Sequence, residues 1–324
     1  MEAESTLRAF GITAPCVSCT QLTGGHIHTT WRVDTAAGSF ILQELRHENP
    51  TAMMGNIALL TEHVRGRTDV RIPQYYATAE GLLWEGRFRL MDCIPGESVS
   101  AASPPKQIEA AGFAFGRFDA ALHGLVGLQA AYPGLHDTRA YLKRLHRLRL
   151  PEEHTTLRRM AATLGEAACA LWEAQKNGLL PQRTVHGDTK GANVLLCGSE
   201  AAVIDLDTAG DGLIAYDYGD GIRSLAQKEG VLDRERFRAF TRGFLRGMPL
   251  LSEAEIDSLI PGIYSISAEL AMRYLIDLTE GCRYFGKTPA QTVARVHELL
   301  TFALVTLEQE NELRGEVQRL RTSE

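Results

Sequence analysis

Several features are scarce in this 324-residue chain, and each scarcity excludes a class of protein. No apolar run approaches the roughly 18 residues that a transmembrane helix needs, so we expect no membrane span. Basic residues are outnumbered, with 34 Lys and Arg against 40 Asp and Glu, so we expect no nucleic-acid partner. Cys16 and Cys19 form a Cys-x-x-Cys pair that no second pair follows, which argues against a structural zinc site.

The rest of the composition is typical of a globular protein. Hydrophobic residues make up 44% of the chain and charged residues 23%. The first five residues are acidic and lack the pattern of a secretory leader, so we expect a cytoplasmic protein with reduced thiols. The length favours two lobes over one compact domain.

The most informative segment is Val185–Leu196, which contains Asp188, Lys190 and Asn193. The next apolar run ends in Asp205. A turn cluster separates the two runs, so the pattern predicts a hairpin. The ends of that hairpin would bring the side chains of Asn193 and Asp205 together.

These residue types are suited to phosphoryl transfer. Asp188 can accept the proton of a hydroxyl group, and Lys190 can offset charge on the transferred group. The oxygens of Asn193 and Asp205 can hold Mg²⁺, and we expect Asp207 on a second ion. The alternative is that Asp188 and Asn193 only cap a turn, as Asp and Asn often do. The clustering of these residues around one hairpin favours the functional interpretation.

Residues 1–92 predict a small antiparallel sheet with one helix, which we interpret as a nucleotide-binding lobe. Gly24 and Gly25 precede an alternating run, a pattern that predicts strand, glycine turn and strand. Glycines at this point, with His28 close by, would let backbone N–H groups approach a phosphate. An ordinary hairpin turn is the alternative interpretation.

A later strand of this lobe, 39–45, carries Gln43, where kinase-like folds usually place a lysine for the nucleotide phosphates. Without that lysine, Lys190 and Mg²⁺ would have to offset more of the phosphate charge. Residues 51–65 have the apolar spacing of a helix. Further strands are predicted at 75–78, 82–84 and 88–92.

The lobe boundary is predicted at residues 93–97, a hinge that contains Pro and Gly. Adenine would lie against backbone groups between Met91 and Ile94. Residues 98–324 predict a larger, mainly helical lobe that holds the catalytic loop and the substrate pocket. Asp217 is expected to brace the catalytic loop through backbone hydrogen bonds. Helices are expected near 106–125, from 138, and at 153–177, 256–280 and 292–312, before a frayed tail over 314–324.

Together these motifs resemble the aminoglycoside phosphotransferase and choline kinase-like superfamily. The main motif of this resemblance is His186-Gly187-Asp188, followed by Asn193 and then by Ile204-Asp205. Several shorter runs resemble the N-acetylhexosamine 1-kinase branch. They include Phe40-Ile41-Leu42-Gln43, His136-Asp137-Thr138, Tyr216-Asp217-Tyr218-Gly219-Asp220 and the run from Glu269 to Asp277.

The resemblance implies a protein-kinase-like two-lobed α+β fold and ATP- and Mg²⁺-dependent phosphorylation of a sugar. The acceptor would be the anomeric hydroxyl of an N-acetylhexosamine or a related hexose, with Arg273, Asp277 and Tyr284 shaping the sugar pocket. By spacing alone, Glu269, Arg273 and Asp277 fall four apart on a helix, which indicates either a surface ion-pair ladder or a charged stripe that faces a polar cleft.

Two departures from the resemblance stand out. His28 lies where the family usually has Asn, and the helix around 293–297 differs from the pattern of the branch. The alternatives are a kinase of the same fold that acts on an aminoglycoside, choline or homoserine type of hydroxyl, or a nucleotide-binding pseudokinase. A pseudokinase would lack Asp188, Asn193 or Asp205, and all three are present. Either a monomer or a homodimer is compatible with the sequence.

Overall fold

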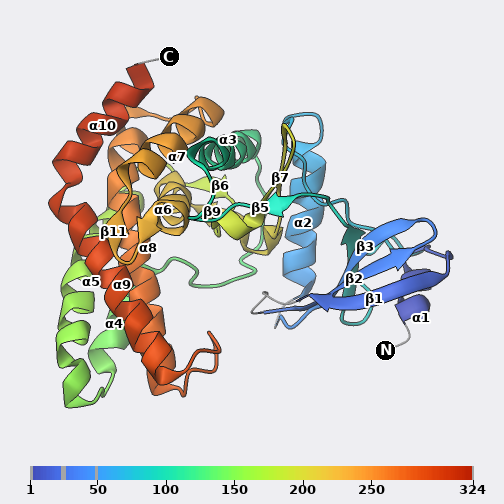
Figure 1. Cartoon of the computed structure of the whole chain (residues 1–324), viewed down its shortest axis with the longest axis horizontal. Coiled ribbons are helices and arrows are strands. Elements are labelled where there is room, and N and C mark those ends of the chain that lie inside the picture. The colour runs from blue at the N-terminus through green and yellow to red at the C-terminus, as the bar shows by residue number, and fades with distance from the viewer. Residues whose placement is uncertain (1–2, 23–26, 48–49, 323–324) are drawn as a thin grey trace.

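A computed structural model describes residues 3–22, 27–47 and 50–322 and has two lobes (Figure 1). The N-terminal lobe is built on a four-stranded antiparallel sheet in the order β1-β2-β3-β4. Its elements are α1 (Ala3–Ala9), β1 (Cys16–Leu22), β2 (Thr29–Thr35), β3 (Gly38–Glu44), α2 (Pro50–Val64) and β4 (Phe88–Asp92). The α+β class with a small sheet lobe is therefore confirmed.

The two faces of this sheet have different partners. Side chains alternate between the faces of a strand, and one face carries Val33, Phe40, Leu42 and Leu90. These side chains form a small core with residues from α1 and the segment after it. The opposite face carries polar side chains, and it is the face that takes part in the site described below.

Two of the predicted strands of this lobe are wrong. Residues 75–78 touch the sheet through single contacts, a bridge between Tyr75 and Met91 and a 2.9 Å hydrogen bond from the Tyr76 N–H to the Leu90 carbonyl. Residues 82–84 form no strand. The N–H of Thr78 binds the carbonyl of Leu82, so local turn bonds occupy backbone groups that a ladder would need.

The C-terminal lobe is mainly helical. Its helices are α3 (Pro105–Ala121), α4 (Thr138–Arg147), α5 (Thr155–Lys176), α6 (Ile214–Leu225), α7 (Arg234–Gly247), α8 (Glu253–Thr279), α9 (Pro289–Glu308) and α10 (Glu310–Thr322). The side chains of α8 are buried along most of its length, because other helices surround it (Figure 1). No helix in the described part of the chain is long and apolar enough to cross a bilayer.

Short strands position the predicted catalytic loop within this lobe. They are β5 (Glu97–Ser98), β6 (Arg183–Val185), β7 (Val194–Cys197), β8 (Glu200–Val203), β9 (Gly210–Gly212), β10 (Gln227–Lys228) and β11 (Val231–Leu232). Strands β7 and β8 form the predicted hairpin, and β6 pairs with β9. The chain leaves the N-terminal sheet at Asp92, and the next strand, β5, pairs with β7 of the C-terminal lobe.

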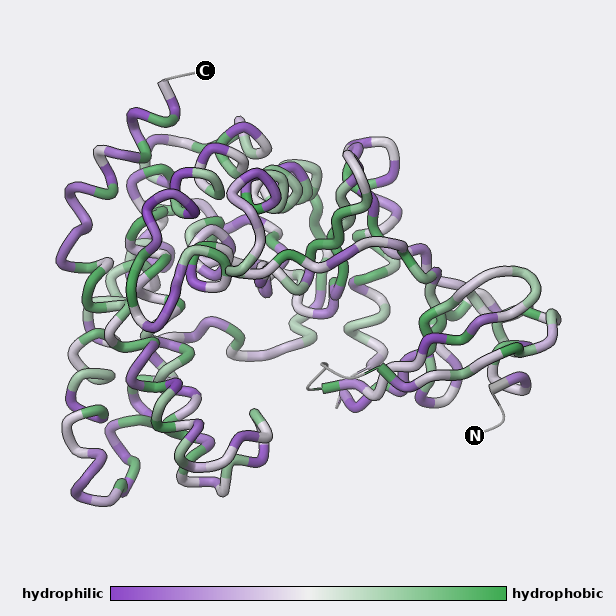
Figure 2. Tube along the Cα trace, viewed as in Figure 1, coloured by the Kyte–Doolittle hydropathy of each residue, from purple (hydrophilic) through white to green (hydrophobic). Residues whose placement is uncertain are grey.

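The C-terminal segment differs from the expected frayed tail. Residues 310–322 form α10, in which Leu313 and Val317 are almost fully buried. Figure 2 shows hydrophobic residues spaced among hydrophilic ones along this helix, as one buried face requires. Glu316 is buried as well and pairs with Arg234 and Arg238 of α7. The charged composition of the segment concealed this apolar face.

Candidate active site

The loop that carries Asp188 is held by hydrogen bonds to its own backbone. The carboxylate of Asp217, on α6, accepts the N–H groups of His186 and Gly187 at 2.7 and 2.9 Å. The sequence predicted this bracing role, and the contacts confirm it. Gly187 has a φ of +80°, a conformation that favours glycine. Thr208 donates its hydroxyl to the His186 carbonyl at 3.0 Å.

His186 connects this loop to the strand that leads to Asp205. Its Nε2–H donates to the Ile204 carbonyl at 3.0 Å, and its Nδ1 accepts the N–H of Asp188 at 3.2 Å. Burial lowers the pKa of His186, which agrees with a neutral ring that donates once and accepts once. The ring thus fixes the distance between Asp188 and Asp205.

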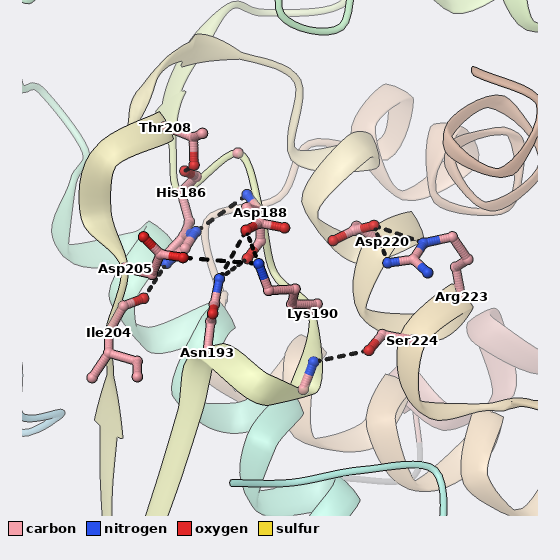
Figure 3. Close-up of polar contacts among 12 residues, drawn as sticks. His186, Asp188, Lys190, Asn193, Ile204, Asp205, Thr208, Asp220, Arg223 and Ser224 are labelled. Carbon is pink, nitrogen blue, oxygen red and sulfur yellow. Dashed lines mark hydrogen bonds and ion pairs between the residues drawn. The ribbon is translucent and has the colours of Figure 1, made fainter. Parts of the chain in front are cut away.

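The carboxylate of Asp188 is bound by Lys190 and Asn193 (Figure 3). Its Oδ2 accepts Lys190 Nζ at 2.5 Å and Asn193 Nδ2 at 3.0 Å. Burial alone would raise the pKa of Asp188, but the Lys190 ammonium and these hydrogen bonds lower it. The Asp188 side chain is 30% exposed, so an acceptor hydroxyl can reach it.

Asn193 and Asp205 form a pair of oxygen donors that fits a divalent cation. Asn193 donates Nδ2 to both the side chain and the carbonyl of Asp188, which turns its Oδ1 away from that residue. Asp205 has a left-handed backbone with φ 63°, and its side chain is 43% exposed. Burial, followed by the charge of Asp207, raises the pKa of Asp205 to about 6, so a nearby cation would stabilise its charged form.

Within the described residues, no three or more His, Cys, Asp or Glu side chains form a metal cluster. Mg²⁺ does not require one, because it is commonly bound by one or two carboxylates together with substrate phosphates and water. The donor set of Asn193 and Asp205 is of this kind.

Asp207 has different partners from those we expected. Its two oxygens accept a fork of hydrogen bonds from Arg89, at 2.5 and 2.9 Å, and His28 Nε2 lies 2.8 Å from Oδ2. Burial opposes ionisation, but Arg89 and His28 hold the pKa of Asp207 well below its usual range. Both oxygens are therefore engaged and the residue is 5% exposed, so Asp207 is held by an ion pair to the N-terminal lobe. Its binding of a second ion stays a prediction.

The residues predicted to contact the nucleotide lie in different surroundings. Gln43 binds within the sheet, accepting Arg89 Nε at 2.8 Å and donating to Thr30 at 3.0 Å. Met91 is buried in β4, and Ile94 is half-buried in the segment before β5. Their contact with adenine stays a prediction. Gly24 and Gly25 lie outside the described residues.

The predicted substrate residues lie together at the end of α8 and in the loop after it. The Arg273 guanidinium lies over the rings of Tyr141, Tyr284 and Phe285, at 5.7 to 5.8 Å from their centroids. Arg273 also donates to the Tyr284 hydroxyl at 3.2 Å. Tyr284 is 53% exposed.

Asp277 contributes to this region through the backbone. Its carboxylate is 3% exposed and accepts the N–H groups of Tyr284 and Phe285 at 2.8 and 3.1 Å. A buried carboxylate with these partners holds the loop in place, and a direct contact of Asp277 with a substrate stays a prediction. The surface ion-pair ladder read from the spacing is wrong, since Glu269 and Asp277 are buried.

A further connection, which the sequence did not predict, joins α8 to the catalytic loop. His136 Nδ1 donates to Glu269 at 3.0 Å, and Nε2 donates to the Gly187 carbonyl at 3.1 Å. Burial would lower the pKa of His136, but the Glu269 carboxylate raises it to about 9. The ring is therefore a cation with both N–H groups bound. Thr138 also donates to Glu269, at 2.9 Å.

The fold and this constellation define a kinase-like protein with a two-lobed architecture and a phosphoryl-transfer type of loop. Residues 18–251, most of the chain, match the phosphotransferase enzyme family. The chain belongs to this family and is a kinase-type phosphotransferase.

Solved structures show the same fold at low sequence identity. A choline/ethanolamine kinase family protein from Mesorhizobium loti superposes with a TM-score of 0.63 at 19% identity, covering 99% of this chain and 98% of that one. A spectinomycin phosphotransferase, solved with ADP and spectinomycin, gives 0.62 at 13% identity, covering 95% and 98%. An amicoumacin kinase, solved with AMP-PNP and Ca²⁺, gives 0.60 at 15% identity, covering 91% and 88%.

Proposed function

We propose that this protein is an ATP- and Mg²⁺-dependent kinase of a small molecule, and that its acceptor is a sugar hydroxyl. The observation that carries the proposal is the arrangement of Asp188, whose charged carboxylate is partly exposed and is bound by Lys190 and Asn193. The neighbours that were solved with ADP or with an ATP analogue support ATP as the donor.

In this mechanism Asp188 orients the acceptor hydroxyl and takes its proton. The acceptor oxygen forms a bond to the γ-phosphorus while the bond from that phosphorus to the leaving oxygen of ADP breaks. Lys190 Nζ is bound to Asp188 and lies 3.8 Å from Asp205. Its charge would therefore lie beside the transferred phosphoryl group, between the acceptor and the metal ion. Asn193 and Asp205 would hold Mg²⁺, which offsets phosphate charge when bound. The chain's own contribution is therefore mainly positioning and electrostatic.

The surroundings of Arg273 favour an uncharged or anionic acceptor. Within the described residues no carboxylate forms an ion pair with this guanidinium, although the charge of Glu269 acts on it from a distance. A polycationic aminoglycoside or a choline-like cation would be repelled at this position. An exposed aromatic ring such as Tyr284 offers a surface for a sugar face, and a guanidinium can donate to an N-acetyl carbonyl. We therefore propose the anomeric hydroxyl of an N-acetylhexosamine or a related hexose.

The proposal is tested by an ADP-release assay over free sugars with and without an N-acetyl group, together with aminoglycosides and amino alcohols. We expect turnover with an N-acetylhexosamine and an acid-labile phosphate in the product, which marks the anomeric position. Asp188→Asn should abolish turnover while nucleotide still binds, and Asp211→Asn, at an exposed position, is the matched control. Turnover confined to a cationic acceptor would refute the sugar assignment, and a fully active Asp188→Asn variant would refute the role of Asp188.

A cytoplasmic location and a monomeric or homodimeric state belong to the same proposal. The availability of ATP in the cytoplasm supports the location, and size-exclusion chromatography with light scattering measures the oligomeric state.

A further inference from the structure

A row of polar side chains crosses three strands of the N-terminal sheet. Thr30 on β2 lies opposite Gln43 on β3, and Gln43 lies opposite Arg89 on β4. Residues paired in this way project from the same face of a sheet. Gln43 donates to Thr30 at 3.0 Å and accepts Arg89 Nε at 2.8 Å, so one chain of hydrogen bonds runs along the row.

Arg89 ends this row with a charge that crosses to the other lobe. It is 1% exposed, and its guanidinium forms the fork to Asp207, which lies just after the metal-binding residue of the C-terminal lobe. His28, immediately before β2, binds the same carboxylate, and its Nδ1 accepts the N–H of Arg46 at 3.1 Å. We call Arg89, Asp207 and His28 the lobe clamp.

We propose that Arg89 is a positioning residue that holds Asp207 and, through it, Asp205. Arg89 thereby provides on β4 the cation of the N-terminal lobe that Gln43, being neutral, does not provide on β3. In this arrangement Asp207 binds Arg89 and no divalent ion, and the metal site consists of Asn193 and Asp205. The proposal rests on the phosphotransfer function above. It replaces the expectation that the N-terminal lobe has no cation at this place.

The position of Asp205 explains why the clamp affects the chemistry. The residue before it, Ile204, is fixed by His186, and the residue two positions later, Asp207, is fixed by Arg89. Asp205 lies between these anchors in a left-handed conformation, which the surroundings must enforce. The clamp therefore sets where the Asp205 carboxylate lies relative to the sheet.

The charges of the clamp also suit a site for a triphosphate. Arg89 compensates Asp207 through a bidentate pair, so the buried carboxylate adds no net negative charge beside Asp188 and Asp205. Replacing Arg89 by a neutral residue would leave that charge with His28 but without its bidentate cation.

The cross-strand register allows a direct test by moving the cation. We expect Arg89→Met to lower kcat at least thirtyfold. The double variant Arg89→Met with Gln43→Lys places a cation on the directly opposing residue and should recover at least tenfold of that loss. Gln43→Lys alone, which adds a second cation beside Arg89, should bring no gain. Absence of recovery in the double variant would overturn the proposal, because a residue that acts by shape alone is not replaced by a charge on another strand.

A second readout does not depend on turnover or on the acceptor. Mn²⁺ binding is measured by electron paramagnetic resonance in the presence of a non-hydrolysable ATP analogue. Asp205→Asn should weaken Mn²⁺ affinity at least tenfold, and Asp207→Asn by a clearly smaller factor, because Asp207 affects the ion only through the position of Asp205. Equal losses in the two variants would identify Asp207 as a metal ligand and overturn the proposal.

These readouts separate the clamp from the proposed function. If no acceptor of the panel is phosphorylated, the sugar proposal fails while the Mn²⁺ comparison still decides the role of Asp207. If Arg89→Met does not fold, Arg89→Lys replaces it, since a lysine keeps the charge but loses the fork. The expected result is then a loss of kcat at least fivefold, with a smaller loss of Mn²⁺ affinity than Asp205→Asn causes, and a wild-type kcat would overturn the proposal.

Discussion

At the scale of single residues, Gly191 determines how closely the catalytic loop lies against its neighbours. Its N–H donates to Ser224 at 2.9 Å, next to the Asp220–Arg223 pair of α6 (Figure 3). A Cβ atom at this position would lie 2.3 Å from the Leu225 side chain and 2.5 Å from the Val99 carbonyl. The carbonyl belongs to the backbone and cannot rotate away, so any side chain at 191 must displace the loop between Asp188 and Asn193.

We therefore expect Gly191→Ala to lower the free energy of unfolding by about 1–3 kcal/mol and to lower kcat. Gly55→Ala is the matched control, because no atom lies within 4 Å of the added Cβ and the site is inside α2. Its helix propensity should leave stability unchanged or raise it by up to about 1 kcal/mol. Urea unfolding of both variants measures the difference, and equal stability would contradict the close contact.

The proximity of residues that are close in the chain could be predicted from the sequence. Asp188, Asn193 and Asp205 carry a pattern of acid, amide and acid around a hairpin, and the structure brings them together. Arg89 was not identified, although an arginine inside the apolar run 88–92 signals a buried cation in need of a carboxylate. Its partner is 118 positions away in the chain, and no local pattern can indicate such a pairing.

At the scale of elements, His136 joins helix α8 to the loop that carries Asp188. Glu269 on α8 and the Gly187 carbonyl bind its two N–H groups, the Tyr216 ring lies 5.3 Å away and Arg273 acts on it electrostatically. Its pKa, about 9, is above the ordinary value of 6.5. The charged ring therefore stabilises the fold fully below about pH 6.5, and this contribution is lost as the pH rises through about 9.

We expect His136→Gln to destabilise the protein at pH 7 by an amount that decreases by about 2 kcal/mol on going to pH 10. The difference in unfolding free energy between wild type and variant, from urea titrations at the two pH values, measures the effect. His297→Gln, at an exposed histidine of α9, is the control and should show no such trend. A pH-independent penalty for His136→Gln would mean that the buried ring is neutral.

The elements themselves were predicted with unequal success, and the reason is periodicity. Helix α2, strand β3 and the β7–β8 hairpin have clear apolar spacing and turn residues, and all three form close to their predicted bounds. The predicted strands at 75–78 and 82–84 have apolar residues too, but their turn closes on itself with local hydrogen bonds. Whether a short apolar segment joins a sheet depends on distant partners, which the sequence does not display.

At the scale of the whole molecule, the apolar core does not follow the boundary between the lobes. The buried residues of α2 belong to the same cluster as those of α3, α6 and α7. The N-terminal sheet has its own small core with α1. Helix α2 therefore packs with the large lobe, although it precedes the hinge in the chain, and the lobe clamp joins the sheet to the same structure.

The same cluster extends to the end of the chain, because it includes Leu313 and Val317 of α10. We therefore expect Leu313→Ala to leave a cavity in the main core and to lower the free energy of unfolding by about 2–5 kcal/mol. Asn311→Ala, on the exposed side of the same helix, should change it by no more than about 0.5 kcal/mol. Thermal and urea unfolding of the two variants measures both values. Equal and small effects would describe a frayed tail, whereas a large effect of Leu313→Ala alone requires that α10 completes the core to which the buried residues of α2 also belong.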